Sequence, residues 1–160
     1  MDKERALPLF KRFGAMMLVA FGILAMTTGV AQAKQTCGSG SLHVICFSID
    51  KVGGDAYAVH VGIDISMSQG DAQLIIDQPG DPVDAWAMGD DWFDNAEFRI
   101  PLTWVAAGPD GLSAEFDITV PGVALDEDPD GGDELYARVR LFDQRTSTRT
   151  FTSGVLRSPF

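Results

Sequence analysis

The stretch from residue 57 to residue 67, YAVHVGIDISM, alternates strictly between apolar residues and small or polar ones. The apolar residues are Tyr57, Val59, Val61, Ile63, Ile65 and Met67. A period of two places all six side chains on one side of a strand, whereas a helix would scatter them around its circumference. Their β-branched character supports the same prediction. We therefore predict a strand with one buried and one solvated face, around which the other strands are organised.

Shorter segments with similar patterns follow, separated by turns rich in Gly and Pro. The predicted strands are 41–50, 57–67, 72–77, 83–88, 96–104, 114–120, 135–141 and 149–156. No segment after residue 33 has a helical period long enough to predict a helix. The pattern predicts an all-β fold, an antiparallel β-sandwich of about eight strands in a single domain.

Three local features refine this prediction. Residues 41–50 carry apolar side chains on both faces, so we expect that strand to be covered on both sides. Gly53 and Gly54 suit the positive φ values of a tight hairpin turn. Pro101 has no N–H for a strand ladder, so the strand at 96–104 should lie at a sheet edge or contain a bulge.

Residues 1–33 have the three parts of a secretory signal peptide. Basic residues precede an apolar run from Gly14 to Met26, which is too short for a comfortable membrane span. Ala31 and Ala33 form an A-x-A site, and cleavage after Ala33 would leave a domain of residues 34–160. We therefore predict export, to the periplasm or as a secreted protein; the alternative is an uncleaved N-terminal anchor.

The predicted mature chain is strongly acidic. The signal peptide carries four of the 12 basic and two of the 23 acidic residues, which leaves eight basic against 21 acidic and a net charge of −13. Such a surface repels nucleic acid and anionic lipid, and it favours cations and basic partners. No further apolar run is long enough to cross a membrane.

Cys37 and Cys46 are the only cysteines. In an exported chain an even pair predicts a disulfide, which for so short a loop contributes roughly 2–3 kcal/mol in the entropic model. The bridge would tie the new N-terminus, a place that otherwise frays, to the first strand. A metal site would need more ligands, and only His43 is near in sequence.

Two segments resemble fibronectin type III or immunoglobulin-like modules, although together they cover under half of the chain. IPLTWVAAGPDG, residues 100–111, is similar to the early strand of that family, whose buried Trp corresponds to Trp104. ELYARVRLFD, residues 134–143, is similar to the start of the last hairpin. In the family the Tyr shares a strand face with the apolar residues that follow it, whereas Tyr136 falls on the opposite face. The resemblance implies a sandwich with a buried Trp104, and it assigns no function because folds of this kind host many.

The stretch DEDPDG, residues 126–131, matches the opening of the D-x-D-x-D-G calcium loop. The candidate metal ligands are Asp126, Asp128, Asp130 and Asp133. The twelfth position is Ala137 instead of the bidentate Glu of an EF-hand. We favour a solvated acidic turn between two strands, and the alternative is a weak Ca²⁺ site.

Trp86, Trp92 and Phe93 lie in or near the acidic stretch GDDWFDN. Exposed aromatic rings beside carboxylates can stack on sugar rings, so these three residues are the candidate ligand-binding residues. The simpler interpretation, which we favour, is that the rings plug one end of the sandwich.

No catalytic constellation is evident. His43 and His60 are the only histidines, His60 falls on the solvated face of its strand, and a G-x-S-x-G nucleophile elbow is absent. We predict an exported, non-enzymatic module that binds a protein or glycan at the cell surface, as an interaction or surface-assembly accessory protein. The alternative is a calcium-assisted carbohydrate-binding module.

Calcium provides the most specific chemical prediction from the sequence. If DEDPDG holds Ca²⁺, millimolar CaCl₂ should raise the thermal unfolding midpoint above its value in EDTA at fixed ionic strength, because a ligand of the folded state stabilises it. Without the bidentate Glu we expect a dissociation constant of roughly 10⁻⁴–10⁻³ M. Asp128→Ala should abolish the rise. An unchanged midpoint, or an equal rise with Mg²⁺, would leave the stretch as a solvated turn.

Overall fold

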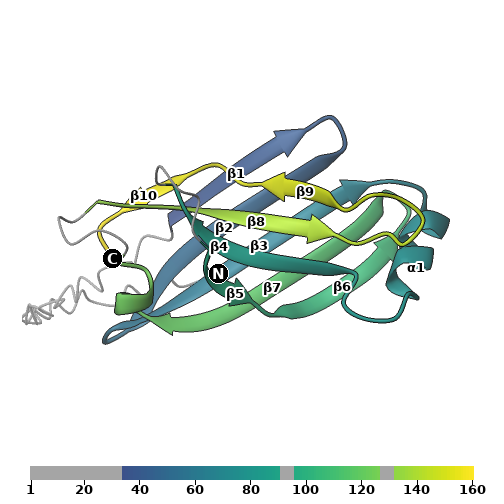
Figure 1. The fold of residues 1–160 in the computed structure, drawn as a ribbon. Coiled ribbons are helices and arrows are strands. Elements are labelled where there is room, and N and C mark those ends of the chain that lie inside the picture. Colours follow the sequence, from purple (N-terminus) through teal and green to yellow (C-terminus); the bar gives the residue numbers. More distant parts are fainter. Residues whose placement is uncertain (1–33, 91–95, 127–131) are drawn as a thin grey trace, which may run out of the picture.

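The computed structural model describes residues 34–90, 96–126 and 132–160. This part of the chain is mostly β-structure, in two antiparallel sheets that share one core (Figure 1). Sheet A has the order β1 (Lys34–Gly40), β2 (His43–Gly53), β3 (Ala56–Ser66), β7 (Gly111–Pro121) and β6 (Leu102–Gly108). Sheet B has the order β10 (Leu156–Ser158), β8 (Asp133–Leu141), β4 (Val83–Gly89) and β5 (Ala96–Ile100), and β9 (Arg149–Thr152) also pairs with β8. This arrangement agrees with the predicted antiparallel sandwich.

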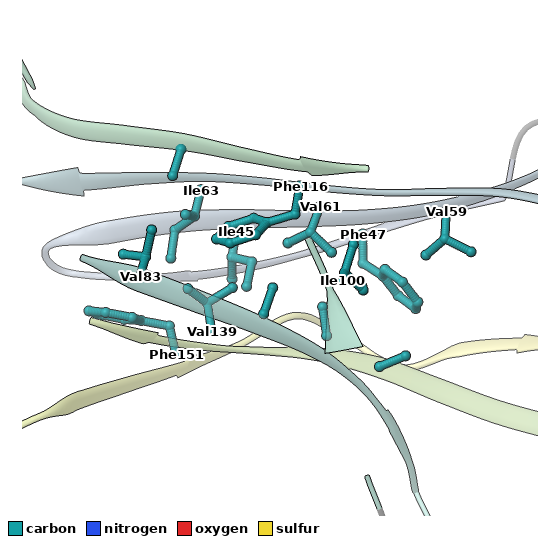
Figure 2. Packing of buried hydrophobic residues seen from close by; sticks show 14 of the residues in the cluster. Ile45, Phe47, Val59, Val61, Ile63, Val83, Ile100, Phe116, Val139 and Phe151 are labelled. Atoms are coloured by element: carbon teal, nitrogen blue, oxygen red, sulfur yellow. The ribbon is translucent and has the colours of Figure 1, made fainter. Parts of the chain in front are cut away.

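β3 lies at the centre of sheet A, between β2 and β7, and its alternation is the one predicted. Val59, Val61 and Ile63 are at most 3% exposed. Figure 2 shows these side chains in one layer with Ile45, Phe47 and Phe116, facing Val83, Val139 and Phe151 of sheet B. Complete burial of one such side chain stabilises the fold by about 1.5–3 kcal/mol, so this layer supplies much of the driving force for folding.

The local sequence predicted the hairpin before β3 correctly, but not the helix after it. The β2–β3 hairpin has the predicted positive φ values, 146° at Gly53 and 55° at Gly54. The prediction of a strand at 72–77 is wrong, because this segment belongs to the helix α1 (Gln69–Ile76). Ser68 caps the helix by accepting a hydrogen bond from the Asp71 N–H at 3.1 Å, and Ser-x-x-Asp is the sequence signal for such a start.

The buried side chains of α1 lie three positions apart, a helical spacing. They are Ala72 and Ile75.

A 3₁₀ turn, η1 (Gly122–Ala124), follows β7. Within the described residues, no helix is both long and apolar enough to span a lipid bilayer.

The strand predicted at 96–104 is divided at Pro101, where the chain crosses from β5 of sheet B to β6 of sheet A. β5 and β6 are edge strands, as the proline predicts. The β6–β7 ladder then shifts register between Leu102 and Trp104. The extra residue, Thr103, forms a β-bulge that reverses the alternation, so that Leu102 packs against the core and Trp104 faces outward.

Trp104 is 48% exposed. The buried Trp104 that the resemblance to immunoglobulin-like modules implies is therefore wrong, and the bulge is the physical reason.

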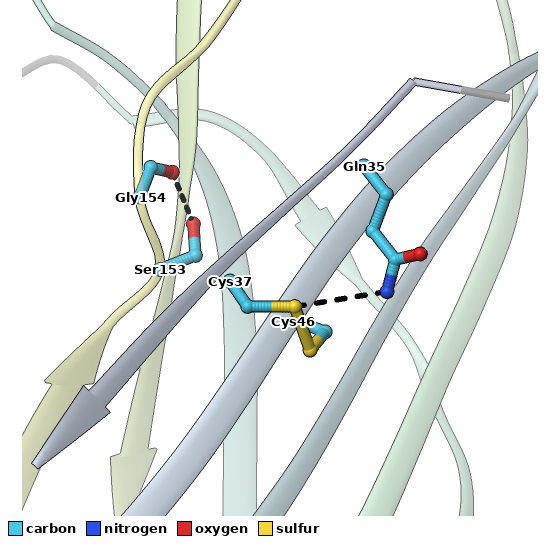
Figure 3. The surroundings of a disulfide bond; sticks show 5 residues. All are labelled: Gln35, Cys37, Cys46, Ser153 and Gly154. Atoms are coloured by element: carbon cyan, nitrogen blue, oxygen red, sulfur yellow. Dashed lines mark hydrogen bonds between the residues drawn. A yellow bond between two sulfur atoms is a disulfide. The ribbon is translucent and has the colours of Figure 1, made fainter.

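The predicted disulfide joins Cys37 of β1 to Cys46 of β2, at directly opposed positions (Figure 3). β1 is a strand that the sequence did not predict, because KQTCGSG lacks apolar alternation; pairing with β2 along its whole length orders it. The expected cover on both faces of residues 41–50 is also wrong. Leu42 and Val44 are 54% and 48% exposed, so only the inner face is covered.

β1 also meets the segment that joins β9 to β10, and this contact closes one side of the sandwich (Figure 3). A Cβ at Gly38 would lie 2.6 Å from the Thr152 carbonyl oxygen, and a Cβ at Gly154 would clash with Thr36 Oγ1. These two glycines therefore allow the backbones to approach. The strand predicted at 149–156 is interrupted at this place.

The face assignment of β3 can be tested by substitution. Ile63→Asp should lower the free energy of unfolding by more than about 4 kcal/mol or unfold the domain, because it buries an unpaired carboxylate. Asp64→Asn, one residue along on the exposed face, should change it by less than about 0.5 kcal/mol. Urea unfolding monitored by circular dichroism measures both, and equal effects would contradict the assignment.

Candidate functional site

The outer face of sheet A, which is the side turned away from the core, carries negative charge. The carboxylates at its outward positions are Asp50, Asp64, Glu115 and Asp117. The two lysines of this sheet are Lys34 and Lys51. Lys34 pairs with Ile49 and Lys51 pairs with Tyr57, so both lysines occupy positions on the core side of the sheet. No lysine or arginine therefore occupies an outward position in the described strands of sheet A.

A shallow hollow lies over Gly62 in the middle of this face. Cross-strand pairing aligns Cys46, Gly62, Glu115 and Trp104 in one row, and Gly62 leaves a gap because it has no side chain. The hollow has a volume of about 180 Å³. The indole of Trp104 lies on one side of it, Val44 and Cys46 lie on the other, and Asp64 and Glu115 supply carboxylates.

A second hollow, of about 330 Å³, lies over Ala58 on the same strand. Asp50 stands opposite Ala58 on β2, and Asp117 and Thr119 line the other side. Ala58 and Gly62 are four residues apart on β3, which corresponds to about 14 Å along a strand. These two hollows lie in line, each with a small residue as its floor and two carboxylates at its sides. A third hollow, of about 390 Å³, lies farther along β3 at Ser66 and is lined by Asp64 and Asp110.

A hydrogen-bonded ridge separates the two hollows. His60 Nδ1 lies 2.8 Å from Asp117 Oδ1, and the Thr103 hydroxyl donates to Asp117 Oδ2 at 2.5 Å. Partial burial raises the pKa of Asp117, but the hydrogen bonds from Thr103 and His60 outweigh it and hold the pKa below 3.8. The prediction that His60 faces away from the core is confirmed. Its Nε2 lies 3.4 Å from the position that a Cβ on Gly62 would occupy, so the ring leans toward the first hollow.

Ser48, His60 and Asp117 occupy adjacent positions across β2, β3 and β7. Ser, His and Asp are also the residue types of the catalytic triad of serine hydrolases. Among the described residues, however, no hydrogen bond joins the Ser48 hydroxyl to His60, and the backbone N–H groups around them belong to a regular sheet. The row thus lacks the nucleophile–base contact that activates a serine.

Part of the predicted calcium site can be located. Asp126 is exposed, whereas Asp133 is 3% exposed and its Oδ2 accepts a hydrogen bond from the Phe160 N–H at 3.3 Å. Asp128 and Asp130 lie outside the described residues. In the described ranges no three His, Cys, Asp or Glu side chains converge as metal ligands, and the calcium hypothesis stays a prediction.

Only part of the predicted aromatic ligand site lies within the described residues. Trp86 lies on β4 of sheet B, half-buried, where it lines a hollow of about 230 Å³ with Arg138 and Arg140. Trp92 and Phe93 lie outside the described residues. The exposed aromatic residue that sequence reasoning missed is Trp104, and the bulge expected near Pro101 was the one signal that pointed to it.

A larger cleft, of about 510 Å³, lies between α1 and the β8–β9 loop. Arg145 spans it, with Nε and Nη2 donating to the two Asp143 carboxylate oxygens at 3.0 and 3.1 Å and Nη1 donating to Asp71 Oδ1 at 3.0 Å. The side-chain and backbone hydrogen bonds from Arg145 lower the pKa of Asp143 to about 2. This cluster joins the helix to the hairpin, and we interpret it as structural.

The Arg145 cluster predicts an acid dependence of stability. The pKa of Asp143 is depressed in the folded state, so its contribution is present above the unfolded value of about 3.9 and is lost as the pH falls toward 2. Arg145→Gln should lower the melting midpoint at pH 7, and its difference from the wild type should shrink between pH 4 and pH 2. Arg149→Gln is the control, because Arg149 lines the same cleft without an ion pair among the described residues. A difference that stays constant with pH would contradict the prediction.

Comparison with known proteins found no matching family model, no matching curated protein and no matching solved structure.

Proposed function

We propose that this chain is an exported, non-enzymatic binding module of the immunoglobulin-like or fibronectin-type-III-like kind, and that it recognises its ligand with the outer face of sheet A. The observation that carries the proposal is the outward position of Trp104 beside the Gly62 hollow. The two antiparallel sheets support this fold class, whereas the exposed Trp104 differs from the buried Trp of that family.

Trp104 does not contribute to the core, and its indole offers a large apolar surface with one N–H donor. Tryptophan is enriched among the residues that dominate binding energies, because it buries much area with little loss of rotamer freedom. The exposed Val44 lies across the hollow from Trp104 and extends the apolar surface over the sheet. This combination is typical of an interaction surface.

Export is supported by the signal-peptide pattern of residues 1–33 and by the Cys37–Cys46 disulfide, since disulfides persist in oxidising compartments. The absence of a nucleophile–base contact in the Ser48 row favours binding over catalysis. A second candidate function is carbohydrate binding, because an exposed indole beside carboxylates can stack on a sugar ring while the carboxylates accept its hydroxyl hydrogens.

The test begins with the exported protein. Its mass should show Lys34 as the first residue and two hydrogens fewer than the dithiol. Used as bait on the exported fraction of the cells that produce it, the protein should retain a partner that Trp104→Ala loses, because truncation of a central Trp typically costs more than about 2 kcal/mol, or about 30-fold in affinity.

Trp86→Ala is the matched control, since it removes a Trp from the outer side of sheet B and should keep the partner. Both variants must show the wild-type melting midpoint. A glycan array read with the same variants separates the two candidate functions. Retention that survives Trp104→Ala but not Trp86→Ala would overturn the assignment to sheet A.

A further inference from the structure

We infer that the outer face of sheet A binds an extended segment of a partner protein that carries two basic side chains four residues apart. The inference rests on the proposed function, because it names the chemistry of the partner for the same face.

The charge distribution of the domain favours a basic partner. All six arginines of residues 34–160 lie on strands of sheet B or in its β8–β9 loop, and several of them pair with neighbouring carboxylates. These ion pairs include Arg99 with Asp81, Arg140 with Asp84 and Arg157 with Glu134. On sheet A, His60 is the one basic side chain at an outward position of the described strands, and it already contacts Asp117. The negative charge of this face is therefore left for a ligand to neutralise.

Each hollow suits the head of one basic side chain. Glu115 and Asp64 at the first hollow and Asp50 at the second are hydrogen-bond acceptors, although Asp64 Oδ1 already accepts from the Ser113 hydroxyl. Asp117 adds negative charge to the second hollow, while its two oxygens contact His60 and Thr103. A guanidinium presents donors in a planar fork that matches carboxylates, and over Trp104 it gains a cation–π contact. Neutral sugars would satisfy the acceptors but would leave the charge uncompensated.

The spacing of the hollows specifies the conformation of the ligand. An extended chain rises about 3.4 Å per residue and directs every second side chain to the same side, so positions i and i+4 point the same way about 14 Å apart. That is the separation of Ala58 and Gly62 on β3. Position i+2 would pass over the His60–Asp117 ridge, and it must be small.

A second copy of this chain is a poorer occupant. Its one segment with this spacing is RTSTR, residues 145–149, in which Arg145 is held by Asp143 and Asp71. Most of the segment lies in the turn between β8 and β9 instead of an extended strand. We therefore assign the face to a different, basic protein.

The experiment is an NMR titration of the exported protein with three acetylated and amidated peptides. TRTSTRT has arginines at i and i+4 with a small residue between them, TRRSTTT has the same charge with adjacent arginines, and TQTSTQT has no charge. TRTSTRT should bind at least about tenfold more tightly than TRRSTTT, because only it reaches both hollows. The shifted amide signals should belong to β2, β3 and β7, and TQTSTQT should not bind.

Variants of the two hollows test the geometry. Asp50→Asn and Asp64→Asn should each weaken TRTSTRT severalfold, and Gly62→Val should block the first hollow while the domain stays folded, because the new Cβ meets only His60 Nε2 at 3.4 Å. Glu97→Gln, which removes an exposed carboxylate from β5 of sheet B, is the control and should leave binding unchanged.

Equal affinity for TRTSTRT and TRRSTTT, or insensitivity to Gly62→Val, would overturn the inference, since general attraction to an acidic protein would then explain the binding. Trp104-dependent binding of a glycan or an uncharged partner would also overturn it while leaving the proposed function intact. Concentration-dependent self-association that Asp64→Asn abolishes would assign the face to a second copy instead. If no ligand or partner depends on Trp104, the proposed function itself fails.

Discussion

Burial of one face of β3 is the constraint on which the rest of the structure depends. The strand lies between β2 and β7, and its apolar residues form the middle of the core. Because side chains alternate, a register slip of one residue would move this entire set into solvent. The same alternation forces His60, Gly62 and Asp64 outward, so the core and the candidate binding face arise from one sequence pattern.

The edges of the two sheets are closed differently on the two sides of the sandwich. On one side β1 lies against the β9–β10 segment, where Gly38 and Gly154 allow a close backbone approach and the disulfide holds β1 to β2. At the other side the chain passes through Pro101 from one edge strand to the other. Both solutions limit the unpaired backbone that an edge strand presents to other chains.

Charge is separated between the two sheets. Surface ion pairs such as Arg99–Asp81 contribute little to stability, about 0–1 kcal/mol each, so their main consequence is to neutralise sheet B. On sheet A the carboxylates face solvent without arginine or lysine beside them at outward positions of the described strands. A field of one sign over a flat face accelerates encounter with oppositely charged partners and is weakened by salt.

The sequence by itself determined which residues of β3 enter the core, the antiparallel strand pattern and the Cys37–Cys46 pairing, because alternation and local spacing carry that information. It also placed Gly62 and Asp64 on the exposed face. Only the tertiary structure decided the orientation of Trp104, since the bulge at Thr103 depends on how β6 pairs with β7 and on the Thr103–Asp117 hydrogen bond. Likewise α1 replaces the strand predicted at 72–77, because side chains spaced three positions apart can be buried there. Which strands pair, and in which register, is set between distant segments, and the local pattern of one segment does not record it.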